Sequence, residues 1–196
     1  MSISTNTTCT AELDAIAAIR WEISDRVSPP RKAHIERVTA LLETLAGRFG
    51  IDVRVARLAG LSHDMDRDLP SWTAFALIAD WRITVSRVER QKPKMLHGAI
   101  SAARLQRCYG VTNEYVVSAV RHHTQGDTSF YDLGLALFVA DFCEPGRRHT
   151  EAAEANQILA LSSLHQMARR IIEFNQRRFG PLEEQTKRLY ARLQGD

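Results

Sequence analysis

The sequence predicts an all-α protein, and three observations support this prediction. Apolar residues recur at intervals of three and four over most of the 196 residues, which is the spacing of one helix face. No stretch alternates convincingly at the period of two that indicates a half-buried strand. Residues that start or stop helices stand between the periodic segments. We therefore expect helices joined by short turns.

The first half of the chain predicts a flexible polar tail over residues 1–10 and a basic loop over residues 84–94. Pro30 suits a helix start, Gly50 a helix end and Asp52 an N-cap. A glycine inside a helix costs up to ~1 kcal/mol relative to alanine, so Gly60 indicates close backbone packing. Four helices are expected here, over residues 11–24, 30–49, 53–65 and 71–81.

The second half predicts helices over residues 95–109 and 113–123, the latter capped by Thr112. Residues 133–142 are apolar nearly all round, which indicates a buried central helix. A long helix capped by Thr150 is expected to reach residue 179, and a last helix to reach residue 193. No linker divides the chain, so residues 11–196 are expected to form one domain, including a C-terminal helical extension over residues 150–193.

Composition excludes several classes of protein. The net charge is only +3, and no run of lysine and arginine resembles a stripe that tracks phosphates, so we expect no nucleic-acid partner. No apolar run approaches the ~18 residues of a membrane span, and the chain start is unlike a signal peptide. Cys9, Cys108 and Cys143 are scattered, which is typical of reduced thiols and a cytoplasmic location.

Six residues form a candidate metal site. His63 and Asp64 are adjacent, and adjacent side chains on a helix can serve one centre only at a helix end or inner edge. A single histidine in an apolar segment is usually an ordinary core residue, but aspartate is seldom buried without a partner or a metal. Imidazole with carboxylate suits Fe, Mn, Co, Ni or Zn. The other four members lie in separate apolar segments: His34, His97, His123 and Asp141.

The sequence around these residues resembles the HD superfamily of metal-dependent phosphohydrolases. Within it, the local motifs are similar to the bacterial YqeK branch, the symmetrical diadenosine tetraphosphate hydrolases, over residues 31–147. These motifs read Arg-Lys-Ala-His at 31–34, Ala-Gly-Leu-Ser-His-Asp at 59–64, Met-Leu-His-Gly at 95–98, Ala-Val-Arg-His-His-Thr-Gln-Gly at 119–126 and Val-Ala-Asp-Phe-Cys-Glu-Pro-Gly-Arg at 139–147.

The resemblance implies an HD-domain helical bundle with additional N- and C-terminal helices and a centre of two divalent transition metal ions, iron by preference. It implies that His34, His63, Asp64 and Asp141 hold one ion. It implies that His97 and His123 hold the other, with Asp64 bridging the two. The implied reaction cleaves a dinucleoside tetraphosphate into two nucleoside diphosphates.

Positive residues are needed to neutralise the polyphosphate in the transition state. Arg147 occupies the family's arginine position, and its alternative is a surface arginine. Arg67, flanked by Asp66 and Asp68, stands where the family usually has lysine. With Asp64 these two arginines are the expected catalytic residues, and substrate binding is expected at Arg67, Thr124, Gly126 and Arg147, with Lys94 and Arg121 as further candidates.

Several alternatives stay open at this level. Residues 124–126 could form an ordinary flexible loop, and Glu144 could orient Arg147, orient a ligand histidine or merely cap a turn. His122 could lie behind the ligands or on the surface, while His149 and His165 have no expected role. The chain could be another HD phosphohydrolase that acts on mononucleotides, dNTPs or alarmones, or a catalytically silent binding protein. A homodimer is also left open.

Overall fold

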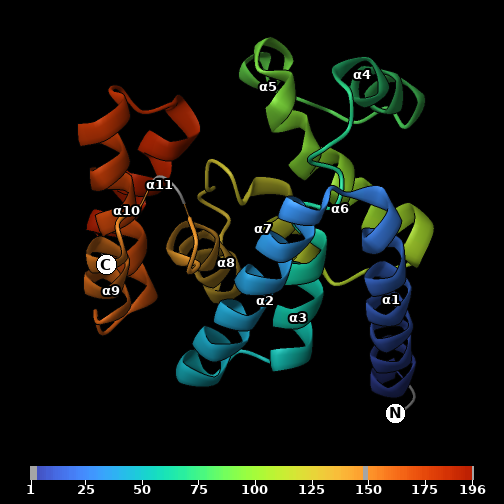
Figure 1. The fold of residues 1–196 in the computed structure, drawn as a ribbon, viewed down its shortest axis with the longest axis horizontal. Helices are drawn as coiled ribbons and strands as arrows, with labels where there is room; N and C mark the ends of the chain where they lie inside the picture. The colour runs from blue at the N-terminus through green and yellow to red at the C-terminus, as the bar shows by residue number, and fades with distance from the viewer. Residues whose placement is uncertain (1–3, 148–149, 196) are drawn as a thin grey trace.

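The computed structural model describes residues 4–147 and 150–195, with side chains described from Asp14 onward. The described residues form eleven α-helices and one 3₁₀ helix, with no strand among them, so the prediction of an all-α fold is confirmed (Figure 1). The helices are α1 Ser4–Arg26, α2 Pro29–Phe49, α3 Val53–Ser62, α4 Ser71–Asp80, α5 Arg87–Gln91, η1 Pro93–Met95, α6 Leu96–Tyr109, α7 Glu114–His122, α8 Asp132–Cys143, α9 Ala152–Leu159, α10 Leu164–Phe179 and α11 Glu184–Gln194.

Helix α8 lies at the centre of the bundle. It packs against α2, α7 and α10, and its residues 133–140 are all buried. Because neighbours cover it on several sides, it has no face on which polar residues could be exposed. The buried central helix predicted from the sequence is therefore confirmed.

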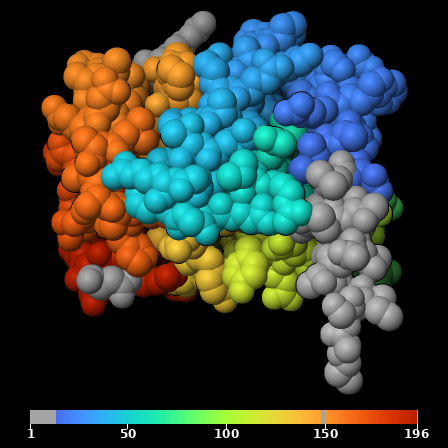
Figure 2. Space-filling model, turned by 90° about the horizontal axis from the view of Figure 1, so that it is seen from below, coloured from blue at the N-terminus to red at the C-terminus, as the bar shows by residue number. Residues whose placement is uncertain are grey.

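The terminal helices cover the flanks of this bundle. Helix α1 packs against α3, while α9 and α10 pack against α8. Figure 2 shows the same order from below, with α2 and α3 between α1 on one side and the C-terminal helices on the other. The N- and C-terminal helices thus bury the outer surfaces of the segments that carry the candidate metal ligands.

Glycines and caps fix the ends of the helices near the site. Gly50 has a φ of +71°, in the left-handed region, and Asp52 accepts a hydrogen bond from the backbone N–H of Arg54. A Cβ added at Gly60 would lie 2.8 Å from Oγ1 of Thr39 and 2.9 Å from its Cα. Glycine therefore allows α3 to lie directly on α2, as the sequence predicted, and brings His63 close to His34.

The boundaries of the structure differ from the prediction at the N-terminus and beside the site. Helix α1 begins at Ser4, so the expected tail is helical from there, and residues 1–3 lie outside the described residues. Helix α3 ends at Ser62 rather than residue 65, because the chain turns at once over residues 63–68.

Two further predictions are wrong because local caps were overlooked. The loop expected over residues 84–94 contains α5, which a reciprocal capping box between Ser86 and Glu89 starts. The single long helix expected from Thr150 is two helices, and Glu151 rather than Thr150 precedes the first. Ser163 caps the second by accepting a hydrogen bond from the N–H of Gln166.

A second, smaller core lies apart from the main one. It consists of buried residues from α4, α6 and the segment between α4 and α5: Ala74, Ile78, Val85, Leu96, Ala99 and Ile100. Figure 1 shows α4 and α5 at the top of the view, away from the central bundle. We call the segment from α4 to η1, residues 71–95, the upper lobe.

Candidate metal centre

Helix ends bring the six predicted residues together. His63 caps the C-terminus of α3, and Asp64 follows in the turn, so the backbone there lets both adjacent side chains face the same point. His123 caps α7 in the same way. The remaining three ligand candidates lie on helices around that point: His34 on α2, His97 in the first turn of α6 and Asp141 in the last turn of α8.

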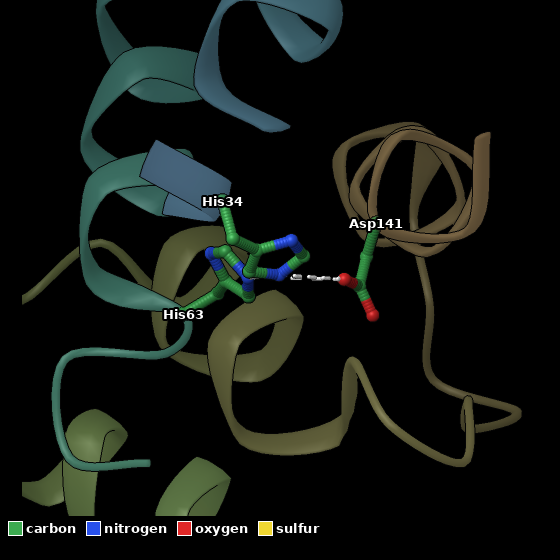
Figure 3. A group of neighbouring side chains, drawn as sticks. All are labelled: His34, His63 and Asp141. Atoms are coloured by element: carbon green, nitrogen blue, oxygen red, sulfur yellow. Dashed lines mark hydrogen bonds and ion pairs between the residues drawn. The ribbon is translucent and has the colours of Figure 1, made fainter. Parts of the chain in front are cut away.

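One group forms around His34. Its Nε2 lies 3.1 Å from Oδ1 of Asp141, 3.4 Å from Nε2 of His63 and 3.5 Å from Oδ2 of Asp64. Figure 3 shows the side chains of His34, His63 and Asp141 pointing toward one another from three different segments. We call these three residues the first half of the centre.

The second half of the centre consists of His97 and His123. Their Nε2 atoms lie 3.1 Å apart, and Oδ1 of Asp64 lies 3.0 Å from the first and 3.5 Å from the second. Asp64 therefore directs Oδ2 to the first half and Oδ1 to the second half. A carboxylate placed in this way can bridge two ions.

The donor set fits divalent transition ions. Two overlapping groups of donor atoms lie close enough to hold an ion, namely His34 with His63 and Asp141, and His63 with Asp64 and His123. His63 is fully buried and Asp64 is 4% exposed. Imidazole nitrogen with carboxylate oxygen is the ligand chemistry of Fe, Mn, Co, Ni and Zn rather than of Mg or Ca.

The outer nitrogens of the four imidazoles hold the rings in place. In three of them Nδ1 donates to a backbone carbonyl. His63 donates to Gly60 at 2.7 Å, His97 to Lys94 at 2.6 Å and His123 to Val120 at 2.8 Å. His34 instead uses a side chain, Glu144 (below). These contacts leave each Nε2 directed at the centre, as a metal ligand requires.

Glu144 resolves one of the alternatives left open by the sequence. It is buried, and its Oε1 lies 3.1 Å from Nδ1 of His34, so it orients a candidate ligand histidine. Nε of Arg37 donates to its Oε2 at 2.5 Å. Sequence reasoning missed Arg37, although it lies three residues after His34 and hence on the same helix face.

The electrostatics of the centre favour a bound cation. Burial lowers the pKa of His63 to about 4. Burial also acts on His34, but hydrogen bonds to Asp141 and Asp64 outweigh it and raise the His34 pKa to about 9. Although burial opposes ionisation of Asp64 and Asp141, the charges and hydrogen bonds around them lower the pKa of both carboxyls. The centre therefore keeps the buried carboxylate of Asp64 and the half-buried one of Asp141 ionised, and a cation would neutralise them.

Two arginines contact these carboxylates directly. Nη1 of Arg31 lies 2.5 Å from Oδ2 of Asp64, and Arg147 contacts both oxygens of Asp141, at 3.0 and 3.3 Å. Arg147 therefore lies beside Asp141 at the centre, and its predicted role toward substrate stays a prediction. Arg31 was missed, although it lies three residues before His34.

Arg67 does not form ion pairs with the flanking Asp66 and Asp68, because both carboxylates bind other residues. Asp66 is bound by Arg104 at 2.9 Å, and Asp68 accepts hydrogen bonds from Ser28. Arg67 itself donates to the backbone carbonyl of Lys94, which is also the carbonyl that holds His97. Arg67 therefore lies at the edge of the centre.

A cavity of about 400 Å³ opens over the centre. Thr124 lines it, with Oγ1 3.3 Å from Nε2 of His123. Arg121 does not line it, because it is paired with Glu89 at 2.5 Å. The cavity wall also contains four arginines, Arg31, Arg37, Arg67 and Arg147.

The remaining candidates lie outside this wall. Gly126 has a φ of +71°, in the left-handed region that favours glycine, and an added Cβ would also meet Leu189 of α11, so backbone conformation and packing account for the glycine. His122 is half-buried and contacts Gln185 of α11, its Nδ1 3.0 Å from Nε2 of the amide. His165 lines a separate cavity at the start of α10, and His149 lies outside the described residues.

The sequence pattern of the HD domain family matches residues 31–161, and the chain belongs to this family. The resemblance inferred from the motifs is therefore confirmed.

Curated relatives are similar over much of the chain. The symmetrical bis(5'-nucleosyl)-tetraphosphatase of Bacillus subtilis is 28% identical over 153 residues, which are 78% of this chain and 79% of that protein. A probable nicotinate-nucleotide adenylyltransferase/Ap4A hydrolase of Mycoplasma pneumoniae is 33% identical over 135 residues, or 69% of this chain and 38% of that protein.

A solved structure has the same fold. It is a predicted HD superfamily hydrolase involved in NAD metabolism from Clostridium acetobutylicum, with a TM-score of 0.81, covering 91% of this chain and 96% of that chain. The sequence identity is 22%, so this likeness concerns the fold alone.

Proposed function

We propose that the chain is a metal-dependent phosphoric anhydride hydrolase that cleaves diadenosine tetraphosphate symmetrically into two ADP. The observation that carries the proposal is the placement of Asp64, whose two oxygens face two separate groups of imidazoles. The printed names of the Bacillus subtilis and Mycoplasma pneumoniae relatives support the class of substrate.

The ligand assignment follows the two halves of the centre. His34, His63 and Asp141 would hold one ion and His97 and His123 the other, while Asp64 would bridge them. We propose iron as the native metal, with Mn, Co, Ni or Zn as substitutes that the same donors accept. When bound, such ions supply Lewis acidity and make water a stronger nucleophile near neutral pH.

The arginines and Thr124 would bind the polyphosphate. Arg147 and Arg31 now contact carboxylates that would become metal ligands, and their N–H groups can turn to phosphate oxygens in the same cavity. Paired N–H contacts of this kind neutralise charge that develops in phosphoryl transfer. We therefore propose Asp64, Arg67 and Arg147 as catalytic residues and Thr124 as a substrate contact. Gly126 would act only by shaping the turn that follows Thr124.

Product analysis tests this proposal. Protein purified without oxygen and loaded with iron or manganese should convert diadenosine tetraphosphate into ADP alone, with ¹⁸O from labelled water in half of the ADP molecules. ATP and AMP in equal amounts would reject symmetrical cleavage. Fast turnover of a mononucleotide, dNTP or alarmone, with none of diadenosine tetraphosphate, would favour another HD phosphohydrolase. Binding of nucleotide without turnover by metal-loaded protein would favour the silent binding protein.

Other expectations from the sequence stay predictions. No helix among the described residues is long and apolar enough to cross a membrane. A cytoplasmic location, a homodimer and the lack of a nucleic-acid partner rest on the sequence arguments above.

A further inference from the structure

A second cavity of about 580 Å³ adjoins the metal cavity. The two cavities share four residues in their walls, which are Ser28, Arg31, Arg67 and His97. Two of these are arginines: Arg31 is paired with Asp64, and Arg67, which donates to a backbone carbonyl, brings positive charge to the border between the cavities. A ligand with a long phosphate chain could therefore extend from one cavity into the other.

The second cavity is built by a different part of the fold. Its walls come from the turn after α3 and from the upper lobe, at the N-terminus of α4 and at η1. The apolar part of the wall consists of Leu69, Pro70, Ala74 and Pro93. Charged residues line the second cavity as well, namely Arg31, Asp66, Arg67, Asp68 and Lys94, whereas the metal cavity has a single apolar residue besides glycine, Pro30.

The border holds an unsatisfied donor. Nε of Arg31 is buried without a hydrogen-bond partner among the described residues, and Oδ1 of Asp68 lies beyond hydrogen-bond distance at 3.6 Å. A buried N–H of this kind costs free energy unless a ligand or water satisfies it. A phosphate oxygen that crosses the border would satisfy it and would also match the charge.

We propose that the second cavity binds the nucleoside at one end of a dinucleoside polyphosphate whose phosphate chain passes Arg31 and Arg67 to the metal centre. This inference rests on the proposed function and specifies it. Ligand cavities of about 300–1,000 Å³ with apolar walls and a few polar groups are typical sites for such molecules. Pro70 and Pro93 offer apolar surfaces to a base, and Asp68 offers a carboxylate to ribose hydroxyls.

The proposal explains how the chain would distinguish a dinucleoside substrate from a shorter one. A substrate with a nucleoside at each end must place one of them at the second cavity. A substrate with one nucleoside can turn its bare phosphate end toward that cavity. Blocking the second cavity should therefore harm the first kind of substrate more than the second.

Ser71→Phe provides the block. Ser71 lines the second cavity, is exposed in the first turn of α4 and does not line the metal cavity. Ala76→Phe is the matched control, because Ala76 is exposed on the same helix and lines neither cavity. The melting temperature and metal content of both variants show that the fold and the centre are intact.

The measurement is kcat/KM for diadenosine tetraphosphate and for adenosine 5'-tetraphosphate. We expect Ser71→Phe to lower kcat/KM for diadenosine tetraphosphate at least 10-fold relative to Ala76→Phe, which corresponds to about 1.4 kcal/mol of lost binding. The kcat/KM for adenosine 5'-tetraphosphate should stay within about twofold. Equal losses for both substrates, or no loss for either, would overturn the inference while the proposed function stands. If metal-loaded wild-type protein cleaves neither substrate, the proposed function fails and this inference fails with it.

Discussion

The two halves of the metal centre are held in different ways. In the first half, charged side chains hold two of the three residues, because Glu144 and Arg37 hold His34 and Arg147 holds Asp141, while His63 donates to the carbonyl of Gly60. In the second half, the outer partners of the two histidines are backbone carbonyls, those of Lys94 and Val120. Asp64 contacts both halves, with Oδ2 directed to the first half and Oδ1 to the second.

This difference predicts that the two halves bind their ions with different affinities. A carboxylate behind an imidazole fixes the ring and makes it a stronger donor, whereas a neutral carbonyl mainly fixes the ring. The first half also contains a carboxylate of its own, Asp141, in addition to Oδ2 of Asp64. We therefore expect the tighter site at His34 and the weaker one at His97 and His123.

The largest effect is expected from Asp64→Ala, which removes a ligand from both halves. The variant should lose both ions, and its activity on diadenosine tetraphosphate should fall at least about 1,000-fold. Metal analysis and steady-state kinetics measure this. Asp25→Ala, at an exposed position of α1, is the control and should keep both properties. His149→Ala, outside the described residues, should also keep them, and a loss equal to that of Asp64→Ala would contradict our assignment of the site.

The next effect separates the two halves. His97→Ala should keep about one tightly bound ion per chain, because the first half remains complete. His34→Ala should lose its ions at a lower chelator concentration, since only the weaker half remains intact. Both variants should lose at least about 100-fold in kcat, because clamping of the phosphates requires both ions. Metal analysis after dialysis against a chelator series checks this, and equal retention by the two variants would remove the difference between the halves.

A smaller effect is expected at Arg147, which contacts a ligand without being one. Arg147→Ala should lower kcat/KM about 100-fold, as loss of one donor to a transition state does, while the ion content is unchanged. Arg147→Lys should restore only part of the activity, because lysine lacks the paired N–H groups. Arg177→Ala, at an exposed position of α10, is the control. An unchanged rate for Arg147→Ala would show that this arginine only balances the charge of Asp141.

The smallest effect is expected from Glu144→Gln, which keeps the shape of the side chain and removes its charge. The affinity of the first half should fall about 10–100-fold, as is typical when an outer partner of a ligand is lost, and the second half should be unaffected. Competition with a chromophoric chelator measures both affinities. A loss in the second half instead would reverse the assignment of Glu144 to His34.

The candidate ligands could be recognised in the sequence because aspartate is seldom buried without a partner or a metal, and because four histidines accompany Asp64 and Asp141 in separate apolar segments. Asp64 and Asp141 in apolar segments already indicated a cation, and the structure brings all six candidates together. The roles of Arg31 and Arg37 could not be predicted, because an exposed and a bound arginine look alike in sequence. The partner of Arg37, Glu144, lies 107 residues further along the chain, so no local pattern links the two.

Features of the fold that depend on local sequence were predicted better than features that depend on contacts between distant residues. The central helix α8 was predicted because its own composition indicates burial on all sides. The break between α9 and α10 was missed because the apolar pattern continues across it, while the cap of Ser163 starts a new helix there. Gly126 was assigned to substrate because its packing partner, Leu189, lies far along the chain.

The most direct test of the account is the metal content of wild-type protein purified without oxygen, together with that of His97→Ala. The account predicts two divalent ions per chain in the wild type, iron in native protein, and one in the variant. A single ion in the wild type that His97→Ala leaves in place would contradict the claim that Asp64 bridges two ions.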